Sequence, residues 1–188
     1  MPNLQRPADR DSRSPSSANS PSVAVIGGSA AGFFTSLLLA RQGLSVRVLE
    51  RIETLEPEAR TLIVTHRMRS LLGEAAESSV LNEIRRFELF TDGRAATITL
   101  NHPDLIIERR TLIQGLAAQA QQAGAKIDLG RRFHGLHPNG RGLVVEAERS
   151  EDGAREEFHA DTVIGGDGAA SGASPDRWWP RQCGRRSR

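Results

Sequence analysis

The fold of this 188-residue chain is decided near its start, by Val23-Ala24-Val25-Ile26-Gly27-Gly28-Ser29-Ala30-Ala31-Gly32. The first four residues form a short apolar run, which is typical of a strand buried on both faces of a parallel sheet. Residues 33–42 are apolar and compatible with a helix that ends at Gly43. Residues 45–50 then form the next predicted strand. The pattern predicts a βαβ unit of about 30 residues.

The glycine-rich loop of this unit has the spacing of a dinucleotide-binding turn. Such a turn needs small residues for a tight bend, for close approach of a pyrophosphate and for helix packing. Gly27 and Gly32 fill the first and third places, and Ser29 fills the second, where its hydroxyl would contact phosphate but narrow the approach. The following helix offers its positive end to an anion. Glu50, 18 residues after Gly32, is placed to bind a ribose diol.

Two other functions fit parts of this pattern. A plain NAD(P)-binding dehydrogenase domain would use the same βαβ unit. The loop also resembles the nucleophile elbow of a hydrolase, with Ser29 as nucleophile, although Ala31 replaces the expected glycine. That fold needs strands before the elbow, and only a polar arm precedes Ser29. The hydrolase is therefore the weakest of these hypotheses.

A second glycine-rich loop, Gly165-Gly166-Asp167-Gly168, follows the short apolar strand predicted at residues 162–164. Its carboxylate can accept hydrogen bonds from sugar or polyol hydroxyls, and its glycines allow a close backbone approach. Ligands of open α/β sheets bind beyond the carboxyl ends of the strands. We therefore expect both loops at the same sheet edge.

The middle of the chain mixes helical and hairpin patterns. Helices are expected where apolar residues recur at helical spacing, and hairpins where alternating segments flank an Asp-Gly turn. The expected helices are 66–73, 76–84 and 110–123, the expected strand is 126–129, and the expected hairpins are 87–90 with 95–100 and 142–149 with 155–160. The sequence thus predicts an α/β fold with a central parallel sheet and added antiparallel hairpins.

Together these segments resemble the flavoprotein monooxygenase and geranylgeranyl reductase group of FAD-dependent oxidoreductases. The segment 25–32 resembles the group's ADP-binding start, and Glu50-Arg51 its ribose-binding acid with the following base. Residues 161–171 resemble its Gly-Asp-Gly motif, with Gly166, Asp167 and Gly168 at the centre. The resemblance implies that Asp167 contacts the ribityl chain of FAD.

The same resemblance implies two arginines near the flavin. The segment 108–112 is similar to the group's Arg-x-x-Leu/Phe segment, which places the flavin-proximal role on Arg109, with Arg110 as the shifted choice. Arg60 lies where many members keep another such arginine. The cofactor-binding residues implied are therefore Gly27, Gly28, Ser29, Ala30, Ala31, Gly32, Glu50, Arg51, Arg60, Arg109, Gly166, Asp167 and Gly168. No catalytic residue is implied.

This resemblance sets the expected function and domain organisation. The parent enzyme would use flavin reduced by NAD(P)H to hydroxylate or reduce a small organic substrate. The expected parts are a disordered arm at 1–21, an FAD-binding domain at 22–171 with part of a β-rich substrate region at about 85–107, and an Arg-rich tail at 172–188. The tail departs from the group's pattern, so we expect a truncated or frameshifted chain with weak or no turnover.

Composition narrows the remaining possibilities. The net charge of +2 comes from the two ends of the chain, since residues 23–172 carry a net charge of −3. This distribution weakens a prediction of nucleic-acid binding by the folded part. The alternative that remains is a non-catalytic fragment whose basic tail contacts nucleic acid. The lone Cys183 excludes an intramolecular disulfide, and His134 and His137 are expected in a surface loop rather than in a metal site. No apolar run reaches the roughly 20 residues of a membrane span. We expect a cytoplasmic protein.

Overall fold

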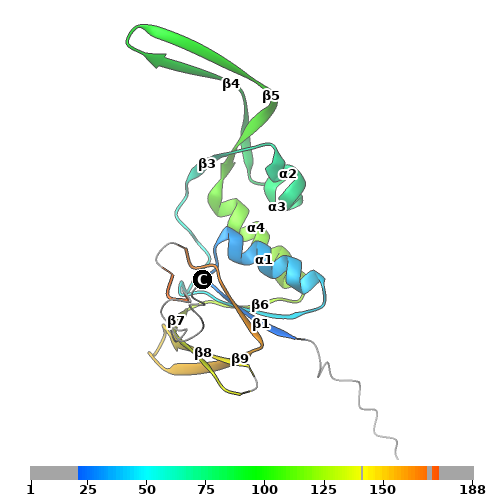
Figure 1. Ribbon diagram of the computed structural model, residues 1–188, viewed down its shortest axis with the longest axis vertical. Helices are drawn as coiled ribbons and strands as arrows, with labels where there is room; N and C mark the ends of the chain where they lie inside the picture. Colours follow the sequence, from blue (N-terminus) through cyan, green and yellow to red (C-terminus); the bar gives the residue numbers. More distant parts are fainter. Residues whose placement is uncertain (1–20, 141, 169–170, 174–188) are drawn as a thin grey trace, which may run out of the picture.

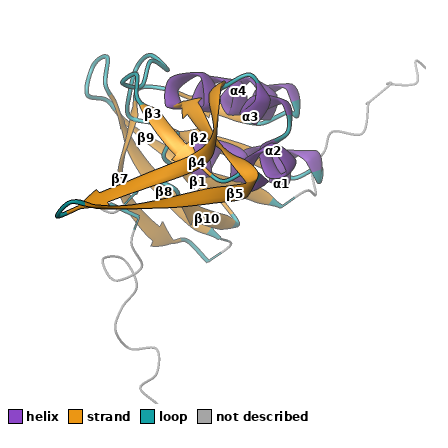
Figure 2. Ribbon diagram, turned by 90° about the horizontal axis from the view of Figure 1, so that it is seen from above, coloured by secondary structure: helices purple, strands orange, loops and turns teal. Residues whose placement is uncertain are grey.

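The computed structural model of this protein describes residues 21–140, 142–168 and 171–173. All but the last residue of the predicted arm and nearly all of the predicted tail, with Cys183, lie outside these residues. The described part is an α/β structure in which helices pack on one face of a parallel sheet and an antiparallel sheet packs on the other (Figures 1 and 2). The predicted fold class is confirmed.

The predicted βαβ unit is present as β1 (Ser22–Ile26), α1 (Ala30–Arg41) and β2 (Ser45–Leu49). Two further strands, β6 (Lys126–Asp128) and β10 (Thr162–Gly165), complete a four-stranded parallel sheet with the order β10-β1-β2-β6. The helix α4 (Arg109–Gln122) precedes β6 as α1 precedes β2. Because both helices lead into parallel strands, both begin at the edge where the strands end.

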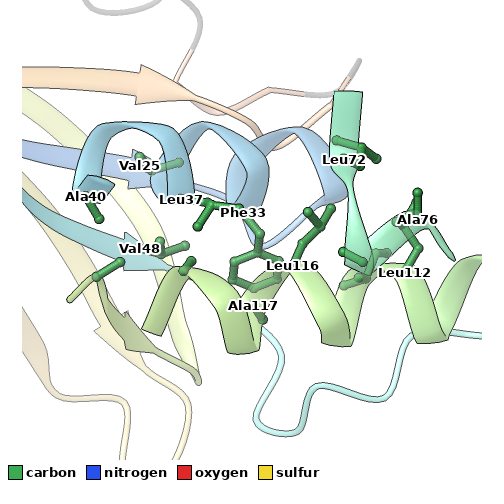
Figure 3. Packing of buried hydrophobic residues seen from close by; sticks show 14 of the residues in the cluster. Val25, Phe33, Leu37, Ala40, Val48, Leu72, Ala76, Leu112, Leu116 and Ala117 are labelled. Carbon is green, nitrogen blue, oxygen red and sulfur yellow. The ribbon is translucent and has the colours of Figure 1, made fainter. Parts of the chain in front are cut away.

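Side chains of the parallel sheet alternate between two cores, as a strand buried on both faces requires. Val25 and Val48 face the helices, where Phe33 of α1 packs against Leu116 and Ala117 of α4 (Figure 3). The opposite face packs against the antiparallel sheet of β7 (Arg131–Pro138), β8 (Leu143–Arg149) and β9 (Arg155–Ala160). The residues of this second core include Ala24, Ile26, Leu49, Val145, Ala147 and Phe158.

A long hairpin extends away from this body (Figure 1). Its strands are β4 (Val80–Thr91) and β5 (Arg94–Glu108), and β3 (Thr61–Val64) pairs with the base of β5. The short helices α2 (Arg67–Leu72) and α3 (Glu74–Glu77) lie between β3 and β4. The Asp-Gly turn is formed as predicted, with φ of 41° at Asp92 and 75° at Gly93, which suits the turn of a two-residue hairpin loop.

The prediction of a helix over 76–84 is wrong beyond Glu77, where α3 ends, and residues 80–84 belong to the strand β4. Val80 pairs with Ile107 and Glu83 with Leu105 in the antiparallel ladder. Register shifts after Val80 and after Ile84 break the alternation of inward and outward residues, so the period of a strand is hidden in the sequence. Pairing with β5 decides the conformation here, because propensity is a weak guide beside tertiary contacts.

The loop expected around His134 and His137 is instead the strand β7, which pairs with β8. His134 Nε2 lies 2.9 Å from Glu148 Oε2, and His137 Nδ1 lies 3.3 Å from Glu146 Oε1. A bulge next to Gly135 and the many polar residues conceal this strand from sequence analysis. No group of three or more potential metal ligands is found among the described residues.

Candidate site at the carboxyl edge of the parallel sheet

The two glycine-rich loops meet at one edge of the sheet, although 137 positions separate Ser29 from Gly166. Strands β1 and β10 are parallel neighbours, with Ile26 opposite Gly165 in register. The backbone N–H of Gly166 donates to the carbonyl of Ile26 at 2.7 Å, which continues the pairing of the strands into the loops. The expectation that both loops share one sheet edge is therefore met.

Backbone packs directly on backbone where the loops touch. A Cβ atom on Gly27, whose φ is 103°, would lie 2.8 Å from the Cα of Asp167. A Cβ on Gly32 would overlap the carbonyl oxygen of Gly27, and one on Gly166 would lie 3.1 Å from the Cα of Gly32. Close approach requires glycine at Gly27 and Gly32, the two places that the spacing predicts, and leaves little room for a side chain at Gly166.

The start of α1 offers a place for an anion. Among the described residues, the backbone amides of Ala30 and Ala31 donate no hydrogen bond, and the first turn contains no acidic residue. Unpaired amides and the positive end of the helix dipole favour a phosphate group. Ala31 is exposed and Ala30 half-buried, and both side chains are small, which fits the pyrophosphate that the sequence predicts there.

The hydroxyl of Ser29 contacts the backbone of both glycine-rich loops. Its hydroxyl donates to the carbonyl of Gly166 at 2.8 Å and accepts from the backbone N–H of Gly32 at 3.1 Å, so that Ser29 caps α1. A hydroxyl has a single proton to donate, and Gly166 takes it. The partners of Ser29 are backbone groups of both loops, which speaks against a histidine-activated nucleophile.

Glu50 follows the end of β2, as predicted for a ribose-binding acid. Both carboxylate oxygens accept backbone hydrogen bonds: the N–H of Gly28 donates to Oε2, and the N–H of Ile52 donates to Oε1 at 3.0 Å. A carboxylate has about four acceptor sites, so two remain for hydroxyl groups. Glu50 thus fastens the first loop to the end of β2 and still presents acceptors at the sheet edge.

Asp167 is also held by its own loop. Ser171 Oγ donates to Oδ1 at 2.6 Å, and the backbone N–H of Gly172 donates to Oδ2 at 2.7 Å. Burial raises the pKa of this carboxyl, but these hydrogen bonds outweigh burial and hold its pKa below the ordinary value. Asp167 is therefore an anionic acceptor at neutral pH, which suits a polyol ligand. The sequence did not single out Ser171 as its partner.

The structure brings two of the predicted arginines together. The backbone N–H of Arg109, the first residue of α4, donates to the carbonyl of Arg60 at 2.9 Å. Because α4 begins at the edge where the parallel strands end, Arg109 lies at the same edge as the glycine loops. The side chain of Arg60 is exposed and pairs with Glu58 at 3.3 Å. Within residues 21–140, 142–168 and 171–173, neither arginine forms a hydrogen bond or an ion pair with the two loops.

The structure also describes the three remaining residues of the predicted site, Arg110, Arg51 and Gly168. Arg110 Nε donates to the carbonyl of Pro57 at 2.8 Å, which commits that side chain to the segment before β3 and favours Arg109 for a ligand. Arg51 is exposed beside Glu50, and its carbonyl accepts a hydrogen bond from Ser150 Oγ at 3.4 Å. Gly168 has a φ of 86°, which glycine adopts readily.

Glu108 supports this edge and was not identified from the sequence as a capping residue. Its Oε2 accepts from the backbone N–H of Thr111 at 2.7 Å, which caps α4, and its Oε1 accepts from the N–H of Arg60 at 3.3 Å. The hydrogen bond from the Thr111 amide lowers the pKa of Glu108 to about 2. Glutamate is not among the residues preferred at a helix N-cap, so the sequence carried no clear signal for this cap.

Comparison with known proteins agrees with this arrangement. The family model of the FAD binding domain matches residues 20–177. Among solved structures, the flavin-dependent monooxygenase PieE, solved with FAD and substrate, is 19% identical with a TM-score of 0.68, and the match covers 82% of this chain and 31% of PieE. A search of the curated proteins found no match.

Two further structures share the fold. A geranylgeranyl bacteriochlorophyll reductase-like protein from Thermoplasma acidophilum is 20% identical, with a TM-score of 0.68 and coverage of 79% of this chain and 39% of that one. The enzyme 2-methyl-3-hydroxypyridine-5-carboxylic acid oxygenase is 21% identical, with a TM-score of 0.67 and coverage of 81% and 41%. The chain thus spans between 31% and 41% of these three structures.

Proposed function

Because this chain belongs to the family of FAD binding domains, we propose that it holds FAD across its two glycine-rich loops. The observation that carries the proposal is the contact between the loops, where Gly27 lies against Asp167 at the carboxyl edge of the sheet. The contact supports the proposal because the N-terminus of α1 and a carboxylate acceptor stand at one sheet edge, and FAD contains both a pyrophosphate and a polyol.

Each residue has a proposed partner in the cofactor. The backbone amides of Ala30 and Ala31 would bind the pyrophosphate, and Glu50 the adenosine ribose, with Arg51 beside it. Asp167, between Gly166 and Gly168, would accept hydrogen bonds from the ribityl hydroxyls. Arg109 and, more loosely, Arg60 would lie near the flavin. These assignments come from the resemblance and are supported by the positions of the residues at one sheet edge.

The complete reaction is proposed from the relatives. When bound, FAD would supply the redox chemistry through its isoalloxazine ring, while the protein supplies binding and electrostatics. We propose NAD(P)H as the electron donor and hydroxylation or reduction of a small organic molecule as the reaction. The matched parts make up 31% to 41% of the three solved structures, and we propose that this chain corresponds to the cofactor-binding portion of such an enzyme.

The test is direct. The purified chain is titrated with FAD, and the absorbance bands of flavin near roughly 370 and 450 nm are followed after removal of free ligand. Retained flavin supports the proposal. A chain that binds NAD⁺ or NADP⁺ but retains no flavin would instead be a nicotinamide-dependent Rossmann domain, and the FAD assignment would be wrong.

A further inference from the structure

We propose that Ser29 is a positioning residue that locks the Gly-Asp-Gly loop onto the phosphate-binding loop, so that both halves of FAD meet their loops in one fixed arrangement. The inference rests on the proposed function. The role proposed here differs from the two that the sequence suggested for Ser29, which are contact with phosphate and nucleophilic attack.

The hydrogen bonds of Ser29 carry the first step. Ser29 lies in the first loop, and its hydroxyl forms two hydrogen bonds. It accepts from the backbone N–H of Gly32 at 3.1 Å and donates to the carbonyl of Gly166 at 2.8 Å. The side chain is half-buried, which shields the bond to Gly166 from water. A side-chain hydrogen bond therefore ties the second loop to the start of α1.

The backbone of Gly166 gives the second step. Its N–H donates to the carbonyl of Ile26 at 2.7 Å, so both of its polar backbone groups are bound to the first βα unit. In a trans peptide the carbonyl and the next N–H point in opposite directions. With the Gly166 carbonyl turned toward Ser29, the N–H of Asp167 is held on the side away from α1. Ser29 thus sets the peptide plane that leads into Asp167.

Helix capping alone would not explain this arrangement, and two variants separate the roles. Glycine is nearly as good as serine at a helix N-cap but has no hydroxyl, so Ser29→Gly removes the bond to Gly166 at little cost to α1. Threonine caps and also keeps the hydroxyl, so Ser29→Thr should retain the lock. Ser36→Ala is the matched control, because Ser36 Oγ donates to the carbonyl of Gly32 at 2.7 Å on the same helix without reaching the second loop.

The experiment has two measurements on the full chain. Amide hydrogen exchange of the ligand-free protein reports the order of the second loop, and titrations with FAD and with ADP report the coupling of the loops. For Ser29→Gly we expect exchange over 165–168 to be about tenfold faster and FAD affinity about tenfold weaker, the size of one lost hydrogen bond. ADP affinity should stay within about twofold, because ADP occupies only the first loop. Ser29→Thr and Ser36→Ala should behave like the unmodified chain.

The outcomes distinguish the two proposals. If Ser29→Gly leaves exchange and FAD affinity unchanged, or weakens FAD and ADP equally, the positioning role is wrong while the proposed function stands. If the unmodified chain binds neither flavin nor ADP, the proposed function is wrong, and the role of Ser29 toward FAD is lost with it.

Discussion

The backbone N–H of Gly28 donates a hydrogen bond to the carboxylate of Glu50, 22 positions further along the chain. The other carboxylate oxygen accepts from the N–H of Ile52 at 3.0 Å. The residue predicted to bind a ribose therefore also shapes the loop that would bind the pyrophosphate. The packing around Gly28 is equally close, since a Cβ at this position would lie 3.0 Å from Glu50 Cγ and closer still to the ring of Phe33.

Glu50→Gln should weaken both the loop and the binding of FAD. An amide has one acceptor oxygen, so either the Gly28 or the Ile52 N–H would face an NH₂ group and lose its partner, at a cost of about 1–3 kcal/mol in unfolding free energy. FAD affinity should fall about tenfold. Urea unfolding and flavin titration measure the two effects. Glu56→Gln, an exposed change in the same segment, should alter neither. Equal behaviour of the two variants would show that Glu50 does not hold the loop.

Gly32→Ala should be among the most damaging single-methyl additions in this chain. The new Cβ would overlap the carbonyl oxygen of Gly27, and that carbonyl belongs to the backbone between β1 and α1. We expect a loss of about 3 kcal/mol or more in unfolding free energy, because a backbone clash cannot be relieved by a change of rotamer. Ala31→Ser, at the exposed neighbouring position, should change stability by less than about 0.5 kcal/mol. A thermal unfolding midpoint for Gly32→Ala close to that of the original chain would contradict the packing described.

Acid should destabilise the protein through Glu108. Its pKa is lowered to about 2 in the folded chain, chiefly by the hydrogen bond from the Thr111 amide, so the unfolded chain binds the proton more tightly. The stabilisation is complete above the unfolded-state pKa near 4.5 and is lost as the pH falls toward 2. The urea midpoint of the original chain should therefore drop more steeply over this range than that of Glu108→Gln. Glu157→Gln, which also removes one exposed charge, should keep the original slope.

Asp167→Ala should release the second loop. The substitution removes the acceptor of the Ser171 hydroxyl and of the Gly172 N–H together. FAD affinity should fall at least about tenfold, and Asp167→Asn, which keeps one oxygen, should lose less. Flavin titration of the two variants checks the order. An asparagine variant weaker than the alanine variant would mean that the loop hydrogen bonds do not govern binding.

The exposed part of the projecting hairpin should tolerate substitutions better than its buried base. Leu89 is 55% and Ile98 47% exposed, whereas Leu105, on β5 near its base, is 0% exposed. Leu89→Ser should change the unfolding free energy by less than about 0.5 kcal/mol, while Leu105→Ala should cost about 2–5 kcal/mol. Urea unfolding compares them. A large loss for Leu89→Ser would reveal that this face is buried by contact with another molecule or copy.

Sequence analysis reached the local parts of this structure. The strand, turn and helix at 23–42 follow from an apolar run, a spaced set of glycines and a closing glycine. All of these signals lie within the segment itself, so no distant part of the chain is needed to predict it. The hairpin at Asp92-Gly93 and the helix ending near Gly124 were predictable for the same reason. The strand at 80–84 was not, because bulges remove its alternation and its partner β5 is separated from it by the hairpin turn.

What the sequence by itself determined is the pair of glycine-rich turns, since the conformations that glycine permits are a property of each residue. Only the tertiary structure decided that these turns touch and that the hydroxyl of Ser29 donates to the carbonyl of Gly166. It also decided that Glu50 accepts a hydrogen bond from the first glycine-rich loop and that Asp167 accepts one from Ser171. The bond between Ser29 and Gly166 exists because the parallel sheet sets β10 beside β1, and the bond between Gly28 and Glu50 exists because it sets β2 beside β1. The bonds of Asp167 depend on the path of its own loop, which glycine spacing alone does not specify.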